Sequence, residues 1–156
     1  MDMQLQGKKA LITGSTYGIG YAIAEALAEE GVDVVITGRY QETVTSAVEK
    51  IKAINSQTKP IGISADCTTP YGCQSVFDAV PKVDILINNL GIYERKQFFE
   101  IDDTDWTRLF EINVMSGVRF TRFYTPKMVS QKWGRVIFIS SESGLMIPPE
   151  MIHYGF

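Results

Sequence analysis

The segment Thr13-Gly14-Ser15-Thr16-Tyr17-Gly18-Ile19-Gly20 follows directly on a short apolar run that begins at Ala10. Behind the glycines, apolar side chains recur at helical spacing: Ile19, Ala22, Ile23, Ala26 and Leu27. Gly31 then stands where a C-terminal cap of that helix belongs. A strand that turns through glycines into a helix lets the main chain approach a phosphate, which the unpaired amides at the helix start attract. This stretch therefore predicts a phosphate-binding turn within a β-α-β unit.

The spacing of these glycines helps to distinguish a dinucleotide site from a Walker-type nucleotide site. It reads G-x-x-x-G-x-G, whereas the general dinucleotide motif reads G-x-G-x-x-G, and Gly20 is not followed by the Lys-Ser or Lys-Thr of a Walker loop. Glycines alone can serve only a tight turn, but between a strand and a helix they favour a bound dinucleotide. The residues expected to hold its diphosphate are Gly14, Ser15, Tyr17, Gly18, Ile19 and Gly20. Tyr17 either touches the cofactor or packs on the helix.

Further along the chain, short apolar runs alternate with helical segments, which is typical of a parallel sheet covered on both faces. The runs are Ala10 to Thr13, Val34 to Thr37, Ile61 to Ser64, Val83 to Asn88 and Val136 to Ser140. They predict an α/β fold of the Rossmann type, a doubly wound parallel sheet with strand order 3-2-1-4-5 that is truncated after about five strands. No linker divides residues 1–156, so we expect a single nucleotide-binding domain that lacks the C-terminal strands and a substrate-binding segment.

Four helices are expected between these strands. The first follows the glycines, the second carries Val44 to Ile54 and ends before Pro60, and the third runs roughly from Cys73 to Ala79. The fourth begins with the carboxylates of residues 103–105, and Pro126 is expected to kink it or end it early.

The composition excludes several classes of protein. With 45% hydrophobic and 21% charged residues, the 156-residue chain is typical of a globular domain. A net charge of −3 makes nucleic acid and anionic membranes poor partners, and a small metabolite fits better. Residues 1–7 have no apolar signal core and no window is long enough to span a membrane, so we expect a cytoplasmic protein. Cys67 and Cys73 match no redox motif or zinc ligand set, so no metal site is expected.

The residue after the second strand bears on the choice of cofactor. An NAD site commonly places a carboxylate there for the ribose hydroxyl, but this sequence has Thr37-Gly38-Arg39. The planar guanidinium of Arg39 suits a ribose phosphate, which favours NADP(H), while NAD(H) stays open and an ordinary exposed arginine is the plain alternative.

Several motifs in the same order resemble those of the classical short-chain dehydrogenases/reductases, across essentially the whole chain. They are the glycine turn, Asp66, Asn88-Asn89-Leu90-Gly91, Asn113, Ser141 and Tyr154. The resemblance implies that Asp66 and the main chain at Cys67 border the adenine, and that Asn89 and Gly91 border its ribose. Asn88 and Asn89 can also serve turn chemistry ahead of Gly91, and the two uses can coexist. Leu90 replaces the alanine usual in the family, so local repacking is expected.

The resemblance also implies hydride transfer between the nicotinamide and a carbonyl or alcohol carbon of a small substrate. In it Tyr154 is the general acid, Ser141 orients the substrate oxygen and Asn113 helps to hold a water relay. A free tyrosine has a pKa near ~10, so the reaction needs a neighbouring cation. The family's lysine would follow four residues after Tyr154, beyond Phe156, and we therefore expect the chain as given to be inactive.

Two other functions stay open: a nucleotide-binding or interaction module without catalysis, and a methyltransferase-like Rossmann protein that binds S-adenosylmethionine. A methyltransferase-like function would give no role to Arg39, Ser141 and Tyr154. Residues expected near a substrate are Tyr93, Glu94, Leu145, Met146 and His153, and they do not identify it. His153 is an acid or base, a pocket wall or a solvent-facing residue. We expect an exposed edge at the fifth strand, with Ile137 and Ile139 meeting water, and a homo-oligomer in the full-length form.

Overall fold

The sheet of this protein holds five parallel strands, and its order confirms the predicted 3-2-1-4-5. The computed structural model describes residues 3–156, so Met1 and Asp2 of the N-terminal stretch considered above lie outside the described residues. The strands run in the order β3-β2-β1-β4-β5. Their bounds are β1 Lys9–Ile12, β2 Asp33–Gly38, β3 Ile61–Ser64, β4 Ile85–Asn88 and β5 Arg135–Phe138. The fold is a truncated Rossmann-type α/β sheet.

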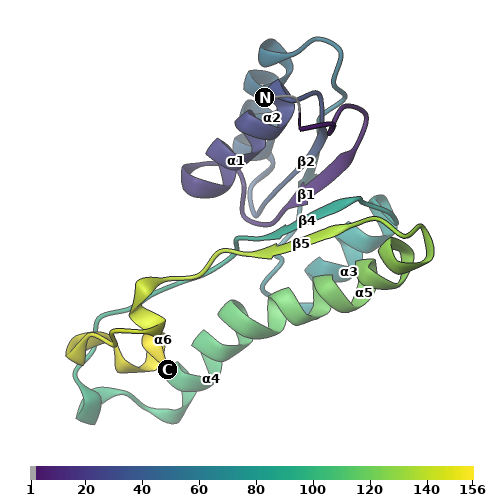
Figure 1. The fold of residues 1–156 in the computed structure, drawn as a ribbon. Helices are drawn as coiled ribbons and strands as arrows, with labels where there is room; N and C mark the ends of the chain where they lie inside the picture. The colour runs from purple at the N-terminus through teal and green to yellow at the C-terminus, as the bar shows by residue number, and fades with distance from the viewer. Residues whose placement is uncertain (1–2) are drawn as a thin grey trace.

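Helices cover both faces of this sheet. They are α1 Gly18–Glu29, α2 Gln41–Ile54, α3 Pro70–Ala79, α4 Asp103–Phe110, α5 Ser116–Ser130 and the short α6 Ile152–Gly155. Figure 1 shows α1 and α2 on one side of the sheet, and α3 and α5 on the other. None of the helices within residues 3–156 has the length and apolar character that a bilayer crossing requires.

The central strand β1 shows why the apolar runs lack a polar side. Ala10 and Ile12 pack into the core under α1 and α2, whereas Leu11 packs into the core under α3 and α5. All three are fully buried. Because successive side chains of a strand point to opposite faces, a strand covered on both faces must be apolar throughout.

The end of α1 follows the predicted glycine cap. Gly31 has φ +79°, in the left-handed region that glycine adopts without strain. The Gly31 amide donates to Ala28 O and the Val32 amide to Leu27 O, both at 3.0 Å. This pair of bonds is the Schellman arrangement. It turns the chain directly into β2.

The predicted long helix is irregular, but not at Pro126, where a kink or an early end was expected. Pro126 lies inside α5, which continues to Ser130, so the expectation that it ends the helix early is wrong. The irregular part lies earlier, where Glu111–Met115 form a π-helical segment between α4 and α5. Single π turns inside α-helices are frequent at functional sites. The segment is centred on Asn113, one of the candidate catalytic residues.

The predicted open edge is present at β5. Within the described residues this strand pairs with β4 alone, and the side chains of Ile137 and Ile139 are 47% and 38% exposed. An edge strand presents unpaired backbone groups that favour association with a further strand or chain. The expectation of exposed apolar side chains there is confirmed.

Candidate functional site

The glycine turn leaves the start of α1 with unpaired amides. Gly14 and Gly18 have φ +62° and +63°, a conformation in which most side chains are strained. No side chain caps α1 at Tyr17, whereas Thr69 caps α3 and Asp102 caps α4. The first amides of a helix have no partner within the helix, and an anion can take that place. The turn thus has the chemistry of a diphosphate site.

Gly20 lets α1 lie directly against the end of β4. A Cβ built on Gly20 would stand 2.5 Å from Asn89 Nδ2 and 2.7 Å from Gly14 O. The same Asn89 amide donates to Thr13 O and Gly14 O, each at 2.9 Å. Asn89 therefore ties the glycine turn to the end of β4 through bonds to residues that lie 75 and 76 positions earlier, rather than within a turn ahead of Gly91. Leu90 packs on the other side of the turn, with Cδ1 3.2 Å from a Cβ built on Gly14.

Two threonines beneath the turn hold it on the sheet, and sequence reasoning gave them no role. Thr13 Oγ1 accepts the amides of Asn89 and Leu90, both at 3.0 Å. Thr37 Oγ1 accepts the Gly14 amide at 3.1 Å. The signal was that each threonine ends an apolar run of the sequence, Ala10 to Thr13 and Val34 to Thr37. Because both are buried, these bonds fix the height of the turn above β1.

The side chains of the turn divide into buried and exposed. Ser15 is fully buried, where its hydroxyl donates to Ile12 O at 2.7 Å and accepts the Thr37 amide at 3.0 Å. Tyr17 and Ile19 are 78% and 64% exposed. Of the two alternatives for Tyr17, packing on the helix is wrong. Ser15 shapes the turn from below, and Tyr17 and Ile19 border its open side.

The residues expected around the adenosine lie after β2 and β3. Arg39 is exposed, with its guanidinium carbon 5.6 Å from the centre of the Tyr40 ring. Asp66 is exposed and accepts the Thr68 amide at 3.1 Å and its hydroxyl at 2.7 Å. Cys67 is buried, and this burial raises the pKa of its thiol to about 12. Neither thiol forms a disulfide, so Cys67 offers its main chain rather than a reactive sulfur.

Asn113 ties the π segment to the chain that follows β4. Its Nδ2 donates to Ile92 O and its Oδ1 accepts the Ile92 amide, both at 2.8 Å. A Cβ built on Gly91 would lie 3.6 Å from the same Oδ1. The side chain of Asn113 is thus used to position the segment after Gly91, beside the expected cofactor site.

Ser141 and Tyr154 lie on two short elements that pack together. Ser141 caps the turn Glu142–Gly144, with its hydroxyl accepting the Ser143 amide at 3.2 Å, and this turn contacts α6. Tyr154 lies on α6 with its ring centre 6.2 Å from that of Tyr93. Leu145 and Met146 beside them are 91% and 82% exposed. His153 is 5% exposed and its ring lies 6.0 Å from that of Trp106, so the solvent-facing alternative is wrong.

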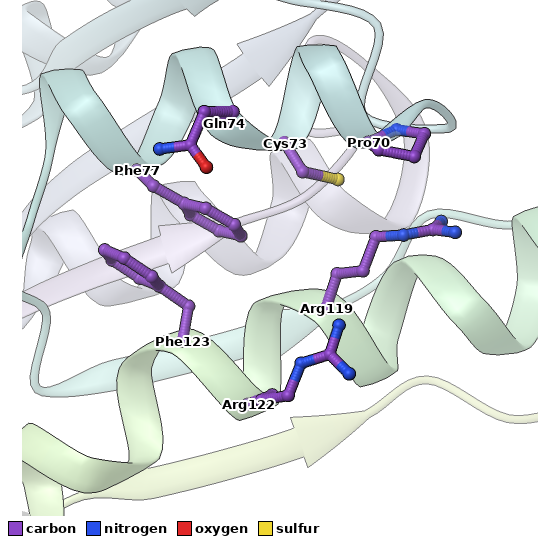
Figure 2. Close-up of a pocket in the computed structure, with 7 residues that line it drawn as sticks. All are labelled: Pro70, Cys73, Gln74, Phe77, Arg119, Arg122 and Phe123. Carbon is purple, nitrogen blue, oxygen red and sulfur yellow. The ribbon is translucent and has the colours of Figure 1, made fainter.

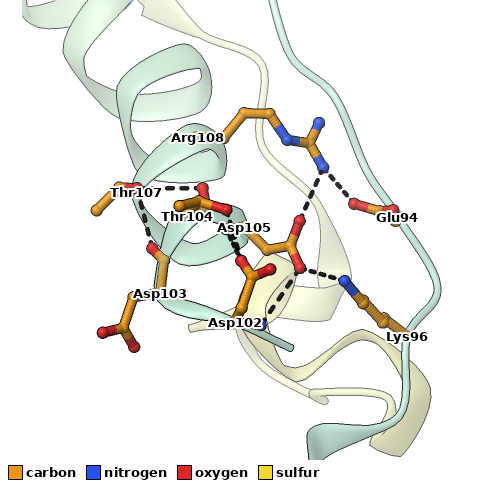
Figure 3. Close-up of polar contacts among 8 residues, drawn as sticks. All are labelled: Glu94, Lys96, Asp102, Asp103, Thr104, Asp105, Thr107 and Arg108. Carbon is orange, nitrogen blue, oxygen red and sulfur yellow. Dashed lines mark hydrogen bonds and ion pairs between the residues drawn. The ribbon is translucent and has the colours of Figure 1, made fainter. Parts of the chain in front are cut away.

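An ionic cluster joins the start of α4 to the segment that carries Tyr93. Figure 3 shows Lys96 and Arg108 reaching the carboxylate of Asp105, with Arg108 also paired to Glu94. Asp102 caps α4 by accepting the Asp105 amide at 2.9 Å. The Lys96 amide in turn donates to Glu150 O at 2.8 Å, which connects the cluster to the segment leading to Tyr154. The cluster therefore joins the start of α4 to the segments that lead to Tyr93 and to Tyr154.

The substitution Asp105→Asn tests that connection. The hydrogen bond from Lys96 and that from the Asp102 amide hold the pKa of the Asp105 carboxyl below its ordinary value of 3.8. The stabilisation is therefore present above about pH 4 and lost as the pH falls through the lower folded pKa. In Asp105→Asn at neutral pH we expect the Lys96 amide, which donates to Glu150 O, to exchange severalfold faster than in the parent chain. The matched control is Asp103→Asn in the same turn, and equal exchange in both variants would contradict the role of the cluster.

Comparisons with known proteins place the whole chain in one family. The family model described as short chain dehydrogenase matches residues 8–155. The uncharacterized oxidoreductase YvaG of Bacillus subtilis is 50% identical over 155 residues, covering 99% of this chain and 59% of YvaG. The 3-oxoacyl-(acyl-carrier-protein) reductase FabG of Aquifex aeolicus is 35% identical over 158 residues, covering 99% of this chain and 64% of FabG. The chain therefore spans about 60% of the length of these relatives.

Solved structures give the same result. L-sorbose reductase from Gluconobacter frateurii, complexed with NADPH and L-sorbose, matches with a TM-score of 0.95 at 32% identity, covering 99% of this chain and 60% of that one. A 7 alpha-hydroxysteroid dehydrogenase complexed with NADH and an oxo bile acid matches with a TM-score of 0.90 at 28% identity, covering 97% and 60%. With the glycine turn, the strand order and these matches in agreement, the chain belongs to the short chain dehydrogenase family.

Proposed function

We propose that the chain binds NADP(H) at the glycine turn and is the cofactor-binding part of a reductase that acts on a small carbonyl or alcohol substrate. The observation that carries this is the uncapped start of α1, held against Asn89 at a position where a Cβ on Gly20 would collide with Nδ2. The amides at Gly18 to Gly20 would hold the diphosphate. When bound, the nicotinamide supplies the hydride.

The chain's own residues would hold the substrate oxygen. Ser141 would orient that oxygen by a hydrogen bond and Tyr154 would give it a proton in reduction. Asn113, through its two bonds to Ile92, holds the segment that brings the Tyr93 ring beside Tyr154. The relatives' complexes with L-sorbose and an oxo bile acid support a carbonyl or alcohol as the substrate class. A homo-oligomer of the full-length form remains part of this proposal.

The preference for NADP(H) over NAD(H) rests on Arg39 and the start of α2. Arg39 is exposed, and α2 begins two residues later without a side-chain cap. A ribose phosphate would meet a guanidinium and unpaired amides there, because both favour a phosphate. Arg39→Gln is expected to raise the Kd of NADPH about tenfold, a little over 1 kcal/mol for an exposed charge-assisted contact, and that of NADH less than twofold.

Calorimetric titration of both cofactors measures this preference. Lys50→Gln, which removes an exposed cation from the other end of α2, is the matched control and should change neither Kd. Equal weakening of both cofactors in Arg39→Gln, or tighter binding of NADH than of NADPH by the parent chain, would overturn the assignment of NADP(H).

The second candidate function is nucleotide binding without turnover by the polypeptide 1–156. Within the described residues, the Tyr154 ring contacts the ring of Tyr93, and no hydrogen bond or ion pair joins Tyr154 to a lysine or arginine. A tyrosine needs a cation nearby to act as an acid at neutral pH. We expect this polypeptide to bind NADPH and to show no oxidation of it with simple aldehydes and ketones, followed by the absorbance of the reduced nicotinamide. Steady oxidation that Tyr154→Phe removes would contradict this, and a failure to bind NADPH would overturn the proposed function itself.

A further inference from the structure

A hollow between α3 and α5 lies apart from the glycine turn and the Ser141–Tyr154 region. It has a volume of about 400 Å³ and is lined by Pro70, Cys73, Gln74, Phe77, Arg119, Arg122 and Phe123. That volume is within the range of small-molecule sites. None of the lining residues belongs to the glycine turn, to the ends of β1 and β4, or to the elements that carry Ser141 and Tyr154.

One end of the hollow is cationic. Arg119 pairs through Nη2 with Glu111, and its Nη1 is buried without a hydrogen-bond partner. Because Nη1 is closed to solvent, a ligand in the hollow meets the charge of Arg119 without reaching this nitrogen. Arg122, one turn further along α5, is exposed and forms no ion pair within residues 3–156. Arg122 thus brings a positive charge to this end that no carboxylate within the described residues pairs.

The other end is aromatic. The rings of Phe77 and Phe123 are stacked, with their centres 4.1 Å apart and their planes 7° from parallel. Figure 2 shows both rings at one end of the hollow and the guanidinium groups of Arg119 and Arg122 at the other, below Cys73 and Pro70. Gln74, above the Phe77 ring, donates to Asp78 at 2.7 Å, so the amide nitrogen of Gln74 is already engaged. An apolar body and an anionic head would match this arrangement.

The thiol of Cys73 lies between these ends and is not suited to covalent chemistry. Cys73 is 1% exposed, and burial raises the pKa of its thiol, while the charge of Arg119 is the largest effect that lowers it. The thiol donates to Cys67 O, with 3.4 Å between the sulfur and the oxygen. A protonated, buried thiol is a poor nucleophile. A ligand of the hollow would therefore bind without a bond to sulfur.

We propose that the hollow between α3 and α5 is a second ligand site, which binds a small aromatic carboxylate. The carboxylate accepts from the Arg122 guanidinium, close to the charge of Arg119, and the aromatic body packs on Phe77 and Phe123. This site is independent of the proposed cofactor function, since neither needs the residues of the other.

The test uses phenylacetate as the probe and phenylacetamide as its uncharged counterpart, with proton–nitrogen correlation NMR of the full 156-residue chain. We expect phenylacetate to shift the Nε–H signals of Arg119 and Arg122 and the amide of Cys73, with a Kd on the order of 1 mM for so small a ligand. Phenylacetamide and inorganic phosphate should bind at least fivefold more weakly, because each lacks one of the two recognised parts.

Two variants and a control distinguish binding of phenylacetate in the hollow from general attraction of the anion to a positively charged surface. Arg122→Gln should raise the Kd of phenylacetate at least fivefold, and Arg122→Lys should keep most of the affinity. Arg135→Gln removes an exposed arginine at the start of β5 and should leave the Kd unchanged. Arg122 has no ion pair to lose within residues 3–156, so the fold should tolerate these changes, which unchanged chemical shifts elsewhere would verify.

Three results would overturn the proposal. Equal binding of phenylacetate and phenylacetamide would remove the role of the arginines, and an unchanged Kd in Arg122→Gln would place the probe elsewhere. Signals of the hollow that follow protein concentration rather than the probe, with a rise in sedimentation coefficient, would show that a second copy of the chain covers it. Because none of these readouts involves a nicotinamide, their failure is distinguishable from failure of the proposed cofactor function.

Discussion

Replacement of Gly20 by alanine is expected to raise the Kd of NADPH about a hundredfold, equivalent to roughly 2.7 kcal/mol of binding free energy. The added Cβ would stand 2.5 Å from Asn89 Nδ2, 2.7 Å from Gly14 O and 3.1 Å from Ser15 Cα. Two of these three atoms belong to the main chain of the turn, which cannot rotate away as a flexible side chain can. The helix start must therefore move off the turn, and the amides that would meet the diphosphate lose their common geometry.

The measurement is titration of NADPH below the unfolding temperature, with circular dichroism to confirm that the variant is folded. Gly144→Ala is the matched control, because Gly144 has nothing within 4 Å of its ideal Cβ and lies outside the turn. Gly18→Ala tests a different cause. Apart from its chain neighbours and its own helix backbone, no atom of residues 3–156 lies within 4 Å of a Cβ built on Gly18, and its φ of +63° alone predicts strain of about 1–2 kcal/mol. If Gly20→Ala binds NADPH within twofold of the parent, the turn is not a diphosphate site.

Replacement of Gly72 by alanine is expected to lower the free energy of unfolding by about 3 kcal/mol, at the upper end for an overpacked site. A Cβ there would stand 2.0 Å from Asp66 O and 2.5 Å from the Asp66 carbonyl carbon. Gly72 is buried in the first turn of α3, and its amide donates to the cap residue Thr69 at 3.0 Å. Relief of the collision requires the loop of Asp66 and Cys67 to shift, so the expected adenine contacts should weaken as well.

Urea unfolding followed by tryptophan fluorescence measures this change, again with Gly144→Ala as the reference. Ser75→Ala provides a second control, because Ser75 lies on the same helix and its hydroxyl donates only to Tyr71 O. A loss of less than 0.5 kcal/mol in Gly72→Ala, within the usual range of surface substitutions, would show that the loop of Asp66 adapts at little cost.

Much of the fold could be predicted because its signals are local. The apolar run Ile61–Ser64 was predicted with its observed bounds, and Gly31 caps α1 as its position indicated. Strand order followed from the general pattern of doubly wound sheets, in which the first strand is central and crossovers are right-handed. These features depend on the periodicity of apolar residues and on backbone preferences, both of which can be seen within a single segment of the sequence.

The irregularity of the long helix was not predicted correctly, and the reason is tertiary. Proline signals a break by losing an amide donor, yet α5 accommodates Pro126. The π segment at Glu111–Met115 carries no residue that signals it. It coincides with the two bonds from Asn113 to Ile92, a contact across 21 residues of sequence. The spacing of apolar residues cannot predict a contact between segments so far apart in the sequence.

For the candidate site, the sequence by itself determined the groups on which the proposed chemistry rests: a glycine turn between strand and helix, an arginine after the second strand, and the spacing of Ser141 and Tyr154. Only the tertiary structure decided how those groups are held. Thr13, Thr37 and Asn89 meet at the same end of the sheet and fix the turn by bonds between distant segments. The physical reason is that backbone conformation is encoded within a few residues, whereas the partner of a buried polar group is chosen by the packing of the whole sheet.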